Sequence, residues 1–484
     1  MKNKIFILIA SLSVVVGCKK FVEVDSPSTN VTSANIYEKD AMAASVLTGI
    51  YTKMSVSSIK YEGLSGICFY TGLSSDELTL IDGLGTPETD GFYTNTLGSQ
   101  ISGFGFWNDI YSQLYVINSA IEGISNSTSL TPTVKKQLLG EAKFLRGFCL
   151  FYLVNLYGDV PLVLSTDYKD NTLILRSAKT EVWKQIVQDL KEAQTLLNPD
   201  YLDATLTKPT QERVRPTKSA ATAMLARAHL YLKDWKEAEA EASALINNPI
   251  YSLVTLDEVF LKNSKEAIWQ LQPVHLGDNS QEAIAFILTP EFGLNYTPVS
   301  LSESLLNDFD LGDQRKLKWI NNAVIDGITY TFAYKYKKIN LTGDVSFPVE
   351  EYSTILRLSE QYLIRGEARI QQGKIAEGIT DLNVLRDRAT DKTVPADQQL
   401  KQLSISLSMN DALTAVEHER QIELFSEGGH RWLDLKRTGR VDDVMRVELP
   451  KKDPNSVWKS FKQYYPISLT ELKNNPRLNQ NEGY

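Results

Sequence analysis

Hydrophobic residues at helical spacing dominate the pattern along this chain of 484 residues. Between residues 34 and 54, Ile36, Met42, Val46 and Ile50 recur near the three- and four-residue spacing of a helix, and residues 107–123 repeat the pattern. Between these two predicted helices, residues 62–106 are rich in Gly, Ser and Thr. That composition predicts a long loop insertion, and loops of this length usually carry function.

Three further segments predict pairs of helices. Residues 133–197 contain one helix that ends where Gly158 and Pro161 stop it, and a second that begins near Thr180, whose hydroxyl is suited to capping. Residues 217–247 fit the tetratricopeptide spacing, and residues 362–388 place small and apolar residues similarly. Because the pairs are scattered and not tandem, we expect one helical scaffold interrupted by insertions, not a uniform solenoid.

Strand patterns are confined to the insertions. Residues 265–300 open with an alternation suited to a short strand and then become loop-rich, and residues 325–358 predict two short strands. A sheet this small does not define a fold. The predicted class is mainly α: a tetratricopeptide-like helical-repeat scaffold with long loop insertions and small β-hairpin elements.

The N-terminal residues have a different pattern. Lys2 and Lys4 precede an apolar run over residues 5–16, and Val15-Val16-Gly17-Cys18 places small residues before a thiol. The run is too short for a bilayer core, which needs roughly 20 residues in a helix, but it suits a secretory signal.

The Val-Val-Gly-Cys ending resembles a bacterial lipobox. That resemblance implies a signal peptide over residues 1–17 and acylation of Cys18, which becomes the first residue after cleavage. Residues 18–33 then form a polar, lipidated linker to a single body over residues 34–484. The alternative is an ordinary secretory peptide with an incidental cysteine.

Composition excludes several classes of function. A net charge of −8 and a sequence pI near 5.3 provide no positive field for nucleic acid. With Cys18 assigned to the anchor, Cys68 and Cys149 allow at most one disulfide, and the sequence leaves their pairing open. His418 and His430 have no zinc-site spacing and no acidic loop has EF-hand spacing, so we predict neither a metal nor a cofactor.

A charged cluster lies between residues 411 and 440. Glu417, Arg420, Glu423 and Glu427 recur every three or four positions, so they share the face of a helix that Gly428-Gly429 is expected to end. One interpretation is a catalytic carboxylate pair near His430, as glycosidases require. The favoured interpretation is a partly buried ion-pair network, since so many arginines would hold the carboxylates ionised.

Three stretches resemble the signature segments of the SusD/RagB family, the surface lipoproteins with which Bacteroidetes capture nutrients. They are EAKFLRGFCLFYLVNLYGDVPLV, ERQIELFSEGGHRWLDLKRTGR and YYPISLTELKNNPRLNQNEGY. The resemblance implies attachment to the outer face of the outer membrane and partnership with a SusC-like TonB-dependent transporter. It also implies binding and delivery of a nutrient, commonly an oligosaccharide, without chemistry on it. An extracellular glycoside hydrolase and a tetratricopeptide-type interaction scaffold are the alternatives.

Sugar pockets combine an aromatic platform with a few convergent polar groups, and two insertions supply this mixture. The first set of candidate ligand contacts is Tyr70, Asp76, Phe92, Tyr93, Asn95 and Phe104. The second set is His275, Asp278, Asn279, Phe292 and Tyr296. For each ring, packing beneath its own loop is the competing interpretation. Trp107 and Trp432 are expected to be core residues because of their helical register.

Overall fold

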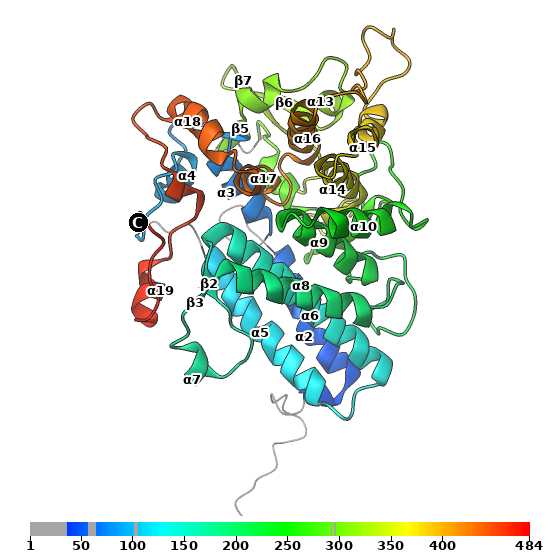
Figure 1. The fold of residues 1–484 in the computed structure, drawn as a ribbon, viewed down its shortest axis with the longest axis vertical. Helices are drawn as coiled ribbons and strands as arrows, with labels where there is room; N and C mark the ends of the chain where they lie inside the picture. The colour runs from blue at the N-terminus through cyan, green and yellow to red at the C-terminus, as the bar shows by residue number, and fades with distance from the viewer. Residues whose placement is uncertain (1–35, 57–63, 101–104, 292, 295–296) are drawn as a thin grey trace, which may run out of the picture.

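The computed structural model describes residues 36–56, 64–100, 105–291, 293–294 and 297–484 (Figure 1). Cys18, the predicted signal peptide and the linker therefore lie outside the described residues. The long helices are α2 (Asp40–Ser55), α3 (Leu64–Ser74), α5 (Phe106–Asn126), α6 (Pro132–Tyr157), α8 (Lys179–Leu196), α9 (Lys218–Tyr231), α10 (Trp235–Ile246), α14 (Leu358–Gln371), α15 (Ile375–Arg388), α16 (Met409–Leu424), α17 (His430–Thr438) and α18 (Val441–Lys452). The short helices are α4 (Pro87–Tyr93), α7 (Tyr168–Asn171), α11 (Gln281–Phe286), α12 (Glu303–Asn307), α13 (Gln314–Lys318) and α19 (Leu469–Asn474), with 3-10 turns η2 (Ile36–Glu38) and η3 (Ser460–Gln463).

The strands are few and short, and they pair in twos. They are β1 (Leu78–Leu80), β2 (Val160–Pro161), β3 (Arg176–Ser177), β4 (Ala267–Leu271), β5 (Val299–Leu301), β6 (Ile320–Ile325), β7 (Ile328–Ala333) and β8 (Ser353–Arg357). The antiparallel pairs are β1 with β5, β2 with β3, β4 with β8, and β6 with β7. The mainly α class is therefore confirmed.

The helices form a continuous scaffold. In sequence order, α5 packs on α6, α6 on α8, α8 on α9, α9 on α10, α10 on α14, and α14 on both α15 and α16 (Figure 1). Helix α6 begins with Pro132, which suits the first turn, and it ends at Gly158, whose φ of 78° favours glycine. Helix α8 begins at Lys179 with Ala178 as its N-cap, so Thr180 lies in the first turn and does not cap the helix as predicted.

Glycines allow close approach within the α14–α15 pair. The turn between the helices passes through Gly373, whose φ is 80°. A Cβ atom on Gly378 would lie 2.6 Å from the backbone oxygen of Gly366 and 2.5 Å from a side-chain carbon of Ile370. The two helix backbones therefore meet at a distance that only glycine permits.

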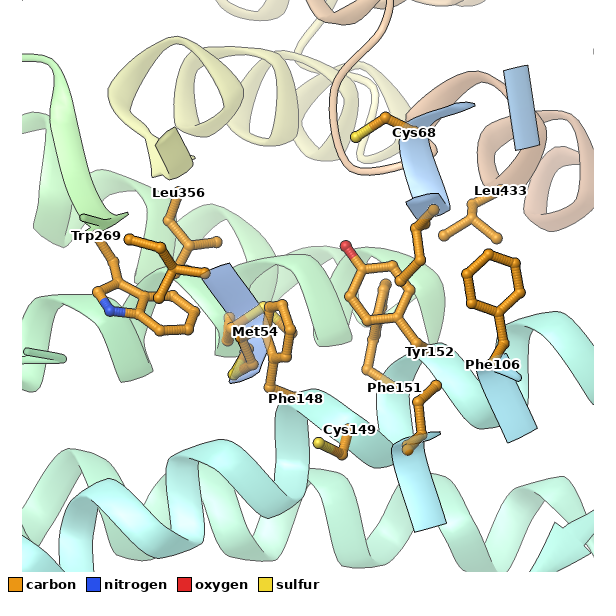
Figure 2. Close-up of a cluster of buried hydrophobic side chains, with 14 of the residues drawn as sticks. Met54, Cys68, Phe106, Phe148, Cys149, Phe151, Tyr152, Trp269, Leu356 and Leu433 are labelled. Carbon is orange, nitrogen blue, oxygen red and sulfur yellow. The ribbon is translucent and has the colours of Figure 1, made fainter. Parts of the chain in front are cut away.

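The core is built around large rings from distant segments (Figure 2). Trp269 of β4 is fully buried, with its ring centroid 5.0 Å from Phe144 and 5.5 Å from Phe148 of α6. Trp107 and Trp432 are also buried, which confirms the prediction from their helical register. Cys68 and Cys149 are both buried and do not form a disulfide with each other.

Two local features differ from the sequence prediction. Helix α3 lies within residues 62–106, which predicted a loop, and its residues from Gly66 to Ser74 are all buried. A helix that is buried on every side has no hydrophobic period, so the pattern could not reveal it. Helix α16 ends at Leu424, before Gly428-Gly429, because Ser426 already adopts a positive φ of 56°.

A substitution at Gly378 tests the close approach in the scaffold. We expect Gly378→Ala to lower the free energy of unfolding by roughly 1–3 kcal/mol, because the added methyl group meets a backbone oxygen that cannot move away. Gly49→Ala in α2 is the matched control, since nothing lies within 4 Å of the position that its added methyl group would take. That control should raise the free energy of unfolding by about 0.5–1 kcal/mol. Equal effects of both substitutions in denaturant unfolding would contradict the packing argument.

Candidate functional site

The charged cluster between residues 411 and 440 belongs to a larger buried ion-pair network. Arg357 of β8 donates to Glu423 at 2.7 Å, to Glu427 at 2.7 Å and to Glu266 at 3.0 Å. Arg315 donates to Glu423 at 2.8 Å, and its side chain is fully buried. The network joins segments that are 66 to 108 residues apart in the chain.

The arginines keep these carboxylates ionised. Burial alone would raise the pKa of Glu423, but the guanidinium groups of Arg388, Arg357 and Arg315 outweigh it and hold that pKa well below 4.5. Burial also raises the pKa of Glu427, but the charges of Arg357 and Lys335 outweigh it and lower that pKa overall. A general acid needs the opposite shift, so the cluster has the character of a structural ion-pair network.

A cleft of about 1280 Å³ lies among the scaffold helices. We call it the helical cleft; its walls come from α9, α10, α12, α14, α16, α17 and α18. Its buried charges are already paired: Arg431 with Asp76 at 2.7 Å, Arg437 with Glu367 at 2.6 Å, and Arg420 with Asp434 at 2.7 Å. Arg420 bonds Asp434 through Nε, and its buried Nη1 and Nη2 atoms have no hydrogen-bond partner among the described residues.

Asp76 and Glu77 are neighbouring carboxyl groups with opposite pKa shifts. Burial raises the pKa of Asp76, but its pairing with Arg431 outweighs this and lowers it overall. Burial raises the pKa of Glu77 to about 7. Split values of this kind can indicate an acid–base pair. Glu77, however, is buried and accepts the backbone N–H of Ser426 at 3.1 Å, so its carboxyl serves the packing between α3 and the segment after α16.

Most candidate contacts in the first insertion lie in the core. Tyr70 and Phe92 are buried, with ring centroids 4.7 Å apart, and both contact Phe106. Asn95 is buried and donates to the carbonyl of Ser74 at 3.2 Å. Tyr70, Phe92 and Asn95 therefore support the loop from within, whereas the paired Asp76 lines the helical cleft. Tyr93 is partly buried beneath Lys452, whose ammonium lies 5.0 Å from the ring centroid. Phe104 lies outside the described residues.

The second insertion divides in the same way. Asn279 is buried, and its side chain joins the second insertion to residues 348–351. It donates to the carbonyl of Pro348 at 3.0 Å and accepts from the backbone N–H groups of Glu350 and Glu351. His275 is exposed and Asp278 is partly exposed. Phe292 and Tyr296 lie outside the described residues. The structure therefore does not gather the described candidate residues of the two insertions into one pocket.

A second concave surface, of about 530 Å³, lies beside the β6–β7 hairpin. We call it the hairpin groove. One wall is residues 287–291 of the second insertion, and the other is residues 321–324, Phe332, Tyr334, Lys337 and Ile339. The partly buried Tyr334 ring meets Phe332 edge-on at 5.9 Å, and the amide side chains of Asn321 and Asn322 are exposed. A ring beside neutral amides is the mixture that sugar binding requires.

Sequence reasoning missed the residues of this groove. It assigned residues 325–338 to a minor strand, although Tyr330, Phe332, Tyr334 and Tyr336 recur at every second position. A period of two is typical of one face of a strand, and it was the available signal. In the structure β7 ends at Ala333, so only Tyr330 and Phe332 lie within the strand. Tyr336 is buried, whereas the buried Phe332 and the partly buried Tyr334 line the groove.

Among the described residues, no group of three or more His, Cys, Asp or Glu side chains is arranged to hold a metal ion. Within the same ranges, no helix has the length and apolar character needed to cross a bilayer.

Comparison with known proteins gives consistent matches. A family model described as "Starch-binding associating with outer membrane" matches residues 92–232, and one described as "SusD family" matches residues 322–484. "SusD-like protein P25" of Formosa agariphila is 23% identical, with 97% of each chain covered.

Solved structures share the fold. A SusD superfamily protein from Bacteroides vulgatus superposes with a TM-score of 0.74 at 21% identity, covering 93% of this chain and all of that one. A protein described as "Laminarin binding SusD-like protein" has a TM-score of 0.72 at 21% identity, covering 91% of this chain and 99% of that one. At these identities, the likeness to solved structures is one of fold.

The ion pairs predict loss of stability in acid. Burial raises the pKa of Glu360, but its pairing with Arg227 outweighs this and lowers it from 4.5 to about 2. A carboxyl whose pKa is lower in the folded state stabilises the fold above its unfolded pKa, and this contribution is lost as the pH falls through the folded value. We therefore expect the free energy of unfolding to fall between about pH 4.5 and pH 2, with Glu360 alone contributing roughly 3 kcal/mol.

Denaturant titrations at a series of pH values would measure this slope. The raised pKa of Glu77 has the opposite effect on the free energy of unfolding. Its stabilising contribution is present below pH 4.5 and is lost as the pH rises to about 7, which lies above the acid window. Glu360→Gln should reduce the acid slope, whereas Glu181→Gln, in an exposed ion pair with Lys184, should leave it unchanged. An equal slope in all three proteins would show that the buried pairs do not control acid stability.

Proposed function

Because the chain belongs to the SusD/RagB family, we propose that it is a surface-exposed outer-membrane lipoprotein that binds an oligosaccharide and delivers it to a SusC-like TonB-dependent transporter. The observation that carries the binding step is the hairpin groove, in which the Tyr334 ring lies beside exposed amides. The lipobox ending at Cys18 supports the anchor and the exterior location. The transporter partnership is inferred from family membership.

A carbohydrate ligand agrees with the chemistry of the groove. A sugar ring presents flat patches of C–H to an aromatic face and hydroxyl groups to amides, and Tyr334, Asn321 and Asn322 supply both kinds of contact. One matching family model is described as starch-binding, and one relative of the same fold as laminarin-binding. Laminarin and soluble starch are therefore the first glycans to test.

We infer that binding occurs without chemistry on the ligand. Asp76 and Asp434 at the helical cleft and Glu423 and Glu427 in the buried network pair with arginines, and their pKa values are lowered, which favours the ionised forms. Glu77, whose pKa burial raises to about 7, is buried and accepts the backbone N–H of Ser426. Hydrolysis of a glycosidic bond needs one carboxyl group that stays protonated to act as the acid. Incubation with each glycan should therefore produce no new reducing ends, and sustained turnover would replace the binding proposal with the hydrolase alternative.

Removal of the Tyr334 ring tests the groove directly. We expect Tyr334→Ala to weaken binding of the recognised glycan about tenfold, because a lost stacking contact is worth about 1.4 kcal/mol. Calorimetry or affinity electrophoresis against laminarin and starch would measure the change. Tyr334→Phe keeps the ring and should retain most of the affinity.

The control for this experiment is Tyr115→Ala, which removes an exposed tyrosine from α5. It should bind as tightly as the wild type. Thermal unfolding of each variant would identify any loss of fold. Unchanged affinity in a folded Tyr334→Ala variant would show that the glycan binds elsewhere.

The anchor has its own test. Cys18→Ser should abolish incorporation of radiolabelled palmitate and release the protein from the outer-membrane fraction, because the thiol that carries the acyl chains is lost. Labelled cells and fractionation would measure both effects. Protease added to intact cells should degrade the wild-type protein if it faces the exterior. A Cys18→Ser protein that stays with the membrane and keeps its label would contradict the lipobox assignment.

A further inference from the structure

The hairpin groove carries few charges, and they are unequally matched. Of the described residues that line it, only two are charged: Glu291 on the wall formed by residues 287–291, and Lys337 on the opposite wall. The other polar groups are neutral, and they include the amides of Asn321 and Asn322. The charge that a ligand meets in the groove therefore depends on how Glu291 and Lys337 are paired.

The charge of Lys337 is matched by acidic neighbours. Its ammonium lies 2.5 Å from the carboxylate of Asp257, which also binds the ammonium of Lys318 at 2.8 Å. The hydrogen bonds from Lys318 and Lys337 lower the pKa of Asp257 and keep its carboxylate ionised. A second carboxyl group, that of Glu351, accepts the backbone N–H of Lys337 at 2.8 Å. Among the described residues that line the groove, there is therefore no unmatched cation for an acidic ligand.

The charge of Glu291 is not matched in this way. Its side chain is exposed and forms no ion pair with any of the described residues. The whole chain is also acidic, with a net charge of −8, so the long-range field has the same sign as the local one. Like charges that are brought together at a binding surface suppress the wrong partner. A ligand with an acidic group would meet repulsion from Glu291 without gaining a free cation.

We propose that the hairpin groove selects neutral glycans over acidic ones, and that Glu291 is the residue that determines this preference. This inference rests on the proposed function, because it concerns the glycan that binds at Tyr334. Neutral hydroxyl groups can exchange hydrogen bonds with the amides of Asn321 and Asn322 and need no counter-ion. An acidic group on the sugar would lose part of its hydration beside Glu291 and would gain no ion pair in return.

Glycans that share one backbone and differ only in charge would test this preference. The probes are laminarin and soluble starch, each in its neutral form and with part of its primary hydroxyl groups oxidised to carboxylates. Calorimetry gives the ratio of the two dissociation constants. We expect the neutral form to bind about threefold to tenfold more tightly at low salt, since like charges roughly 7 Å apart near water change an affinity about threefold. The ratio should approach one in about 0.5 M NaCl, where the screening length is about 4 Å.

Two variants change the charges separately. Glu291→Gln removes the unmatched charge, so the ratio should move towards one. Asp257→Asn leaves Lys318 and Lys337 without their shared carboxylate, so the acidic form should gain affinity relative to the neutral form. Glu181→Gln is the matched control, because it makes the same change in net charge at an exposed position on α8 and should keep the wild-type ratio. Thermal unfolding of each variant would identify any loss of fold.

The outcomes separate this inference from the proposed function. Binding of neither form of laminarin or starch would overturn the glycan binding of the proposed function and this inference with it. Binding of the neutral form together with equal or tighter binding of the acidic form would overturn the inference alone. A preference for the neutral form that persists in Glu291→Gln, or at high salt, would assign the discrimination to the shape of the groove and not to its charge, and would also overturn the inference.

Discussion

The arrangement of the molecule depends on the ion pairs made by the buried guanidinium group of Arg357. It pairs with Glu266, with Glu423 and with Glu427, which lie 66 to 91 residues away in the chain. Removing one partner from a buried ion pair costs about 3–5 kcal/mol, because the other charge is left uncompensated in the interior. Strands β4 and β8 and the end of α16 must therefore meet in one arrangement. The helical scaffold and the insertions are fixed to each other at this point.

The parts of the fold that were predictable from sequence are those with local signals. The pairs α6–α8, α9–α10 and α14–α15 follow helical spacing, and Gly158 and Gly373 mark the end of α6 and the α14–α15 turn. The α9–α10 turn instead passes through Lys233, whose φ is 60°. Helix α3 has no such period because its neighbours cover every side. The pair between Arg431 and Asp76 spans 355 residues, so no pattern within one segment could indicate it. Resemblance to a family was more informative than periodicity because it compares the whole chain at once.

Prediction of the site was limited by the same physics. A tyrosine or phenylalanine in a loop has the same sequence signal whether it packs beneath the loop or faces a ligand. Tyr70 and Phe92 are buried in the core, whereas the groove uses Tyr334 from a hairpin that sequence reasoning treated as minor. Burial is decided by segments far away in the chain. The ring that we propose for ligand contact could therefore be chosen only after the fold was known.

The ion-pair network also positions the groove, because it holds the residue next to Tyr334. Lys335 is buried and donates to Glu427 at 2.5 Å and to the carbonyl of Glu423 at 2.8 Å. On the other side of Lys335, the hydroxyl of Tyr336 accepts the backbone N–H of Thr354 at 2.8 Å. The backbone N–H of Tyr334 itself donates to the carbonyl of Trp319 at 2.7 Å.

Because Lys335 and Tyr336 are held inward and the N–H of Tyr334 is paired, the backbone that carries the Tyr334 ring is fixed in position. An ordered ring loses little conformational entropy when a ligand binds, so more of the contact energy contributes to affinity. Burial of Lys335 lowers its pKa to about 8, and this loss of charge stability is the cost of the arrangement. In the proposed binding mode, the buried charges act on affinity without touching the ligand, because they fix the backbone that carries the Tyr334 ring.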